Sequence, residues 1–219
     1  MVQFDQLEIR SYKKSVPNTF IRCKSPKGAA IMFPGMGYTC HGPLLYYTTL
    51  LLEDLGYDVL QLNYKYGGAF SNLPGDEQEK RFNSDIEAAY DAVAGMEYGK
   101  MVLIGKSLGT EAMVHLLNAR KIKNNTRLVW LTPVLNNLHV METLKEKREF
   151  RERSIVITGT NDRYFDTRAL SKMRKGKLCK IIAIRGADHG LDAETGYGSS
   201  IKNIKTAVSK IGSFLSVES

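Results

Sequence analysis

Short apolar segments recur along the chain and predict the strands of a buried sheet. Most of them are nearly continuous apolar runs rather than alternating apolar and polar positions, which is the pattern of strands covered on both faces. They lie at residues 29–33, 59–62, 101–104, 128–131, 154–158 and 180–184. The pattern therefore predicts a mostly parallel central sheet with helices on both faces.

Helical periodicity fills the intervals between these segments. Pro43 stands where a first helical turn tolerates proline, and Gly56 can end the helix that follows. Ser84 and Glu87 have the spacing of a capping box, which places them at the start of a helix or inside one. Apolar residues at positions 201, 204, 208, 211 and 215 predict a C-terminal amphipathic helix.

The chain ahead of the first core segment predicts an antiparallel hairpin. Residues 7–12 and 19–23 flank a turn at Pro17 and Asn18, which favours two paired strands at the edge of the sheet. From residue 29 onward strand and helix patterns alternate, with no Pro- or Ser-rich linker and no repeat. We therefore expect residues 1–219 to form a single α/β domain.

Composition narrows the class of protein. A chain of 219 residues with 43% hydrophobic and 25% charged residues is globular, which excludes disorder, collagen-like repeats and coiled coil. No apolar run approaches the roughly 18 residues of a membrane span, and residues 1–10 lack the features of a signal peptide. The three cysteines are an odd number without metal-ligand spacing, so we expect reduced thiols and a cytoplasmic location.

The net charge of +8 raises the question of an acidic partner. The densest charged run, residues 145–153, mixes both signs, and the basic run at 172–180 is short. This distribution favours solvated basic faces over a nucleic-acid interface. We expect no nucleic-acid partner.

One predicted strand leads directly into a serine between two glycines. Positions 105–109 read Gly-Lys-Ser-Leu-Gly, and a helical pattern begins at once afterwards. A serine on a sharp strand-to-helix turn is crowded, so flanking positions must lack bulky side chains, as Gly105 and Gly109 do. Such a turn raises the hydroxyl of Ser107 above the carboxyl edge of the sheet and makes it a candidate nucleophile. A phosphate-binding loop is excluded, because Lys100 stands where that motif needs glycine.

Three motifs in register resemble the α/β-hydrolase fold family over residues 28–216. After the serine elbow, Asp162 follows a later strand in a Gly-x-x-Asp turn, and His189 follows the last strand in a loop flanked by glycines. The resemblance implies the α/β-hydrolase fold, with a mostly parallel central sheet, helices on both faces and an N-terminal antiparallel hairpin. It also implies a triad in which Ser107 attacks, His189 is the base and Asp162 orients it.

The same resemblance implies an oxyanion hole made of backbone amides. The first core segment ends in Phe-Pro-Gly-Met-Gly-Tyr at positions 33–38, and Pro34 stands where the family commonly has histidine. The implied donors are the amides of Met36 and Leu108, and a shift in loop register would replace Met36 by Gly37.

Other acids and histidines leave alternatives open. Asp162 could instead cap the segment after it, and Asp166 and Asp192 are competing acids. Of the remaining histidines, position 115 is expected to pack inside a helix and position 139 to lie at the surface. The histidine at position 41 lies in a loop, where it is exposed or lines the site.

The resemblance implies hydrolysis of carboxylic esters through an acyl-enzyme, with a small-molecule ester as partner. The lack of room for a large cap favours esters of short to medium acyl chain. This chemistry requires no cofactor and no metal. An acyltransferase or thioesterase with the same triad, or a non-catalytic binding protein on the same fold, stays open. Residues 135–153 leave room for little more than a helix, so we expect no large cap, although these residues or residues 66–75 could shape the site.

Overall fold

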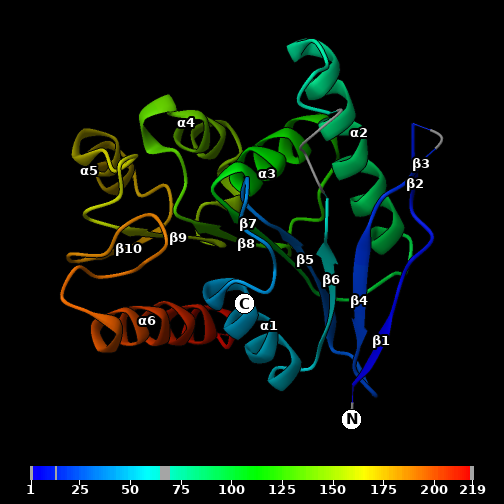
Figure 1. The fold of residues 1–219 in the computed structure, drawn as a ribbon, viewed down its shortest axis with the longest axis horizontal. Coiled ribbons are helices and arrows are strands. Elements are labelled where there is room, and N and C mark those ends of the chain that lie inside the picture. Colours follow the sequence, from blue (N-terminus) through cyan, green and yellow to red (C-terminus); the bar gives the residue numbers. More distant parts are fainter. Residues whose placement is uncertain (1, 13, 65–69, 218–219) are drawn as a thin grey trace.

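One eight-stranded sheet forms the centre of the molecule (Figure 1). The computed structural model describes residues 2–12, 14–64 and 70–217. The strands of this sheet are β1 (Gln3–Asp5), β4 (Asn18–Arg22), β5 (Gly28–Phe33), β6 (Tyr57–Leu62), β7 (Met101–Lys106), β8 (Arg127–Leu131), β9 (Ser154–Gly159) and β10 (Lys180–Ile184). Their order is β1-β4-β6-β5-β7-β8-β9-β10, with β4 antiparallel to both neighbours and all other pairs parallel.

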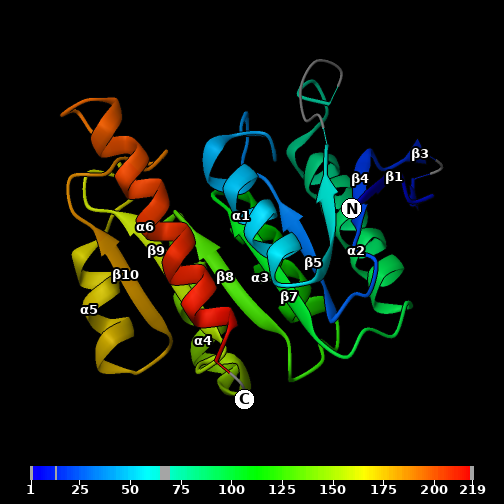
Figure 2. The same cartoon turned by 90° about the horizontal axis from the view of Figure 1, so that it is seen from below.

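Helices cover both faces of the sheet, as the sequence predicts (Figures 1 and 2). In the described part of the chain they are α1 (Pro43–Asp54), α2 (Gly75–Ala94), α3 (Leu108–Ala119), α4 (His139–Glu146), α5 (Thr167–Lys175) and α6 (Tyr197–Leu215). Helices α1 and α6 pack side by side on one face, and the other four lie on the opposite face. None of the described helices is long and apolar enough to cross a membrane.

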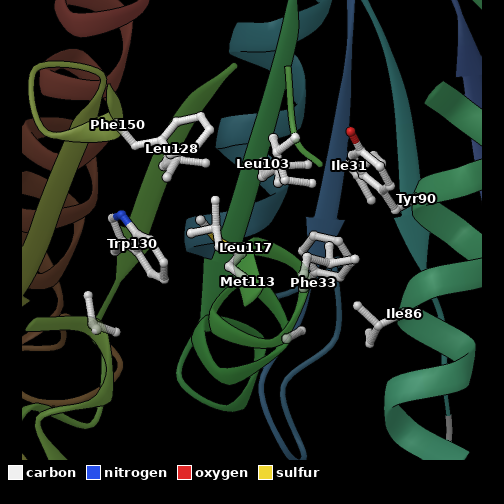
Figure 3. Packing of buried hydrophobic residues seen from close by; sticks show 14 of the residues in the cluster. Ile31, Phe33, Ile86, Tyr90, Leu103, Met113, Leu117, Leu128, Trp130 and Phe150 are labelled. Carbon is white, nitrogen blue, oxygen red and sulfur yellow. The ribbon is translucent and has the colours of Figure 1, made fainter. Parts of the chain in front are cut away.

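The continuous apolar strands contribute side chains to two hydrophobic cores, one on each face of the sheet. In β7, Leu103 faces the core under α2 to α5, whereas its neighbours Val102 and Ile104 face the core under α1 and α6. Figure 3 shows the first of these cores, in which Leu103 lies between strand and helix side chains and Trp130 of β8 is fully enclosed. Burial on both faces explains why these strands lack alternating polar positions.

The N-terminal antiparallel pairing is confirmed, but the predicted partner of β4 is wrong. Strand β4 pairs with β1, not with residues 7–12, and β2 (Arg10–Ser11) folds back on β3 (Lys14–Ser15) in a separate two-stranded sheet. The reason is the side chain of Asn18, whose Oδ1 accepts from the Leu7 amide while its Nδ2 donates to the Leu7 carbonyl. The Asn18 side chain thus pairs with the backbone groups of Leu7 that a ladder with β4 would use.

Two helix boundaries test the local sequence signals. Helix α1 begins with Pro43 as predicted, and Gly56 follows it with φ +79°. Ser84 lies inside α2, not at its start, and its Oγ accepts a hydrogen bond from Ser11 Oγ at 2.9 Å. The Ser84–Glu87 spacing therefore marks the interior of a long helix, which was the second of the two predicted placements.

Candidate active site

The predicted nucleophile lies on a strained turn between β7 and α3. Ser107 has φ 51° and ψ −114°, a conformation outside the wells that non-glycine residues normally occupy. A Cβ atom on Gly109 would overlap the carbonyl of Phe33, and one on Gly105 would overlap the backbone of Gly109. The two glycines are therefore required by close backbone approach, as the sequence predicts.

Backbone hydrogen bonds hold this turn in place. The amide of Ser107 donates to the carbonyl of Leu131 at 3.0 Å, which ties the elbow to the end of β8. The carbonyl of Ser107 accepts from both the amide and the hydroxyl of Thr110, at 2.8 and 2.6 Å. The strained backbone is thus stabilised from both sides, at the carboxyl edge where ligands of open α/β sheets bind.

The predicted acid and base lie together at the same edge of the sheet. Nδ1 of His189 is 2.8 Å from Oδ2 of Asp162, and the side chain of Asp162 is 0% exposed. The other carboxylate oxygen of Asp162 accepts from the amide of Tyr164 at 2.9 Å, and the ring of Tyr164 lies edge-on to His189 at 5.1 Å. A buried carboxylate on Nδ1 fixes both the orientation of the imidazole and the nitrogen that carries its proton.

The nucleophile and the base are not yet in hydrogen-bond contact. Among the described residues, no hydrogen bond of 3.5 Å or less joins Ser107 to His189. The residue before the nucleophile does reach the histidine loop, because Nζ of Lys106 donates to the carbonyl oxygen of His189 at 3.2 Å. Contacts of this kind often tighten only when substrate binds, so the Ser107–His189 pairing stays a prediction.

The predicted oxyanion donors line one cavity of about 570 Å³. Residues 35–38 form a turn in which the amide of Tyr38 donates to the carbonyl of Gly35 at 3.2 Å, with Gly37 at φ +68°. Within the described residues, no protein acceptor takes up the amides of Met36 or Leu108. Two amides without protein partners at the head of a cavity are what an oxyanion hole needs.

The cavity continues from Leu108 along a groove between α2 and α3 that is lined by both apolar and polar side chains. Beyond Met36 and Leu108, its walls are Phe70, Gly75, Gln78, Glu79, Phe82, Asn83, Glu111, Val114, His115, Asn118 and His139. Two histidines there are paired with carboxylates, His115 with Glu87 and His139 with Glu111, each at 2.7 Å. This mixed lining offers a small ligand both hydrogen-bond partners and apolar contacts.

The structure separates the competing acids and histidines. Asp166 caps α5, because its Oδ1 accepts from the amides of Arg168 and Ala169, so the cap is Asp166 and not Asp162. Asp192 lines a different, apolar groove between α1 and α6. His115 is partly buried and packs against Glu87 of α2, but it also lines the groove. His139 is exposed as expected and lines the same groove.

Two loops were expected to shape the site. Residues 65–69 lie outside the described part of the chain, and Phe70, next to them, lines the groove. Residues 135–153 form α4 flanked by the short turns Leu135–Asn137 and Arg148–Phe150, as the length of this segment predicts. His139 at the start of α4 brings this segment to the groove.

The sequence analysis did not single out Lys106, and the structure leaves only 2% of this residue exposed. Burial lowers the pKa of Lys106 to about 8, against the opposing effect of Asp162 and Asp188. One signal was present in the sequence: a lysine at the end of a strand whose other residues are apolar or small. Lysine is almost never fully buried without partners, so a lysine at the end of a buried strand predicts partners nearby.

Comparisons with known proteins agree with the fold. A family model described as "Alpha/beta hydrolase domain" matches residues 27–216. A search of curated proteins found no match. Similar solved structures include an alpha-beta serine hydrolase homologue from Coxiella burnetii, with 13% identity, 94% of this chain and 97% of that chain covered and a TM-score of 0.68.

Two further solved structures are similar to the same extent. Est1E from Butyrivibrio proteoclasticus, solved with ferulic acid bound, has 14% identity, coverage of 96% of this chain and 100% of that chain, and a TM-score of 0.68. An esterase from Pyrococcus furiosus has 13% identity, coverage of 97% and 90%, and a TM-score of 0.68. At such low identities these likenesses establish the fold alone.

Proposed function

Because this chain belongs to the alpha/beta hydrolase domain family, we propose that it is a serine hydrolase that cleaves carboxylic esters of short to medium acyl chain. Ser107 is the nucleophile, His189 is the general base and Asp162 orients the imidazole. The backbone amides of Met36 and Leu108 bind the oxyanion. The observation that carries the proposal is the strained Ser107 elbow, which lies beside two unpartnered amides at the same sheet edge as a histidine paired with a buried carboxylate.

The proposed cycle has two acyl-transfer steps. Oγ of Ser107 attacks the ester carbonyl while Nε2 of His189 takes the hydroxyl proton, and the tetrahedral intermediate carries its negative charge on the former carbonyl oxygen. The intermediate collapses, the alkoxide leaves with the proton from His189, and an acyl-enzyme remains. His189 then takes a proton from water while the water oxygen attacks the acyl carbon. The bond to Oγ breaks, the acid leaves, and the proton on His189 returns to Oγ of Ser107. These steps need neither a metal nor a cofactor.

Backbone geometry supports the oxyanion role in this cycle. Each amide donor aimed at a developing oxyanion typically contributes about 3–4 kcal/mol to the transition state. The amide of Leu108 opens α3, so the positive end of the helix dipole adds to the donor. The amide of Met36 comes from the turn after β5. The end of β5 can lie close to the elbow because Gly109 has no side chain.

The groove supports the substrate range that we propose. Its volume of about 570 Å³ is in the range of small-molecule sites, and polar side chains interrupt its apolar walls, so that extra methylene groups are not enclosed by apolar groups on all sides. A methylene contributes about 0.8 kcal/mol only when it is fully buried among apolar groups. We therefore propose small esters whose acyl or alcohol part carries groups able to form hydrogen bonds.

Active-site labelling with a fluorophosphonate tests the proposal directly. The wild-type protein should be labelled at Ser107, and Ser107→Ala should abolish labelling and lower turnover of p-nitrophenyl esters by several powers of ten. Ser171→Ala, at an exposed position of α5, is the matched control and should behave as the wild type. Labelling that persists in Ser107→Ala at another serine would contradict the assignment.

The cellular setting also belongs to the proposal. All three cysteines are free thiols in the structure, and burial raises the pKa of Cys40 and of Cys179 to about 12. Thiols held in their protonated form are poor nucleophiles, so Ser107 has no competitor of this kind among them. We propose that the enzyme works in a reducing cytoplasm.

A further inference from the structure

Lys106 occupies an unusual place beside the proposed nucleophile. It is the last residue of β7, immediately before Ser107, and its long side chain is almost completely buried. A buried ammonium group is expensive unless other groups replace the water that it has lost. The surroundings of Nζ therefore indicate what this lysine does.

Three contacts surround Nζ, and each comes from a different loop at the carboxyl edge. Nζ donates to the backbone carbonyl of His189 at 3.2 Å and lies 3.4 Å from Oγ1 of Thr132, which follows β8. It also lies 4.3 Å from the centre of the Tyr38 ring, in a cation–π contact. The ammonium thus joins the histidine loop, the end of β8 and the oxyanion loop.

Two contacts fix the side chain of Tyr38 beside the ammonium group. Its hydroxyl accepts a hydrogen bond from the amide of Leu44 at 3.0 Å, and its ring lies so close to Gly42 that a Cβ there would collide with it. Because Tyr38 follows Met36 and Gly37 by one or two residues, fixing its ring also limits movement of the oxyanion turn.

Two carboxylates offset the charge of the buried ammonium. Asp162 and Asp188 both favour its protonated form, although burial outweighs them and the pKa falls to about 8. Asp188 is fixed by accepting the amides of Gly190 and Asp192. The groups that face Nζ are therefore the Asp162–His189 pair, Asp188, and the weakly acidic Tyr38, whose pKa burial raises.

We propose that Lys106 is a positioning residue: it holds the backbone of His189 and the oxyanion turn in register with Ser107. Asp162 fixes the imidazole ring, and Lys106 fixes the loop that carries it, so the base is held at two points. This inference rests on the proposed function. It goes beyond the triad, since Lys106 touches no reacting atom.

The inference has a direct consequence for pH dependence. An ammonium donates a stronger hydrogen bond than a neutral amine, so the hold on the His189 carbonyl weakens as pH rises through about 8. Because the folded-state pKa is lower than the ordinary value of 10.5, the folded state binds fewer protons than the unfolded state between these two values. Stability therefore rises with pH in this window, while positioning is lost.

Lys106→Met tests the role with an apolar side chain of similar length. We expect kcat, and the rate of fluorophosphonate labelling, to fall by roughly 10- to 100-fold with KM little changed, as small displacements of catalytic groups do. The wild-type rate should decline above about pH 8, and this decline should be absent in the variant. The variant should melt at the same or a higher temperature at pH 7, because a desolvated charge has been removed. Lys202→Met, at an exposed position of α6, is the control.

Loss of activity with unchanged or greater stability is a result that a merely structural role would not produce. Thr132→Val provides a second, milder variant that removes one partner of Nζ and keeps the charge, and we expect the alkaline decline to move toward lower pH. Equal labelling rates and equal pH profiles in the wild type and Lys106→Met would overturn the inference.

A measurement on the unmodified protein separates this inference from the proposed function. The imidazole signals of His189, followed by NMR between pH 5 and 10, should show an inflection near pH 8 that reports the titration of Lys106. The signals are assigned by their loss in His189→Gln. Absence of that inflection overturns the role of Lys106, whereas a wild type that fluorophosphonate does not label at Ser107 overturns the proposed function.

Discussion

Replacing Ser107 by glycine should make the protein more stable while it abolishes activity. The backbone of Ser107, at φ 51° and ψ −114°, is strained because its Cβ crowds the neighbouring carbonyls. Glycine has no Cβ and adopts such angles without this penalty. Alanine keeps the Cβ, so Ser107→Ala removes the hydroxyl but retains the strain. The comparison of the two variants isolates the conformational cost of presenting the nucleophile.

The expected difference can be worked out from the backbone angles. A residue held in a sparsely populated conformation destabilises the folded state by about 1–3 kcal/mol. Glycine removes this strain, but its greater freedom in the unfolded chain lowers the free energy of unfolding by about 0.4–1 kcal/mol. Ser107→Gly should therefore exceed Ser107→Ala in free energy of unfolding by up to about 2 kcal/mol. For a chain of this length, each kcal/mol shifts Tm by about 2–4 °C, so the expected gain in Tm is at most about 8 °C.

Thermal and urea unfolding of the two variants measure this difference, with Lys177→Gly as the matched control. Lys177 is exposed, has φ 48° and lies far from the elbow in sequence, so its replacement should release only the smaller cost of a surface left-handed residue. Both variants at position 107 should be inert to fluorophosphonate. A Ser107→Gly protein less stable than Ser107→Ala would refute the reasoning, because it would show that the elbow stores no relievable strain.

The remaining predictions concern the acids, the elbow glycine and the substrate. Asp162→Asn should lower kcat by about 10⁴ through loss of the correct tautomer, and Asp192→Asn should be mild; the reverse order in ester turnover would move the assignment to Asp192. Asp166→Ala should leave turnover intact and lower the free energy of unfolding by about 1 kcal/mol, measured by urea, because it removes the cap of α5. Gly109→Ala should destabilise by about 1–3 kcal/mol or more in the same assay, since the added Cβ overlaps a carbonyl of β5. Specificity constants for acetyl, butyryl, octanoyl and palmitoyl esters should be highest for the shorter chains, and any preference for anionic substrates should fade with salt. A maximum at palmitoyl would show that the acyl chain is enclosed by apolar groups on all sides, against this prediction.

Local sequence patterns determined the main elements of this protein. Continuous apolar runs predicted strands buried on both faces, and the structure shows why: adjacent residues of β7, Val102 and Leu103, face opposite cores. The elbow at Ser107 could also be predicted, because only glycine tolerates the backbone approach at positions 105 and 109. These features depend on residues that are close together in the sequence, so they can be predicted without knowledge of the fold.

Pairings between distant segments could be predicted only in part. The order of Ser107, Asp162 and His189 placed three groups at one edge of a parallel sheet, and the structure joins the last two by a hydrogen bond. The partner of β4 was predicted wrongly. The side chain of Asn18 forms two hydrogen bonds with the backbone of Leu7, and no periodicity of the sequence predicts such a contact.

Tertiary structure alone decided the environment of the site. Lys106 reads in the sequence as one more basic residue, yet the fold buries its ammonium against the carbonyl of His189 and the ring of Tyr38. His139 and Glu111 lie 28 positions apart and meet only because α4 packs against α3. Such contacts depend on how loops from separate strands converge in space. Their energies come from burial and from partners far along the chain, which no local pattern of residues records.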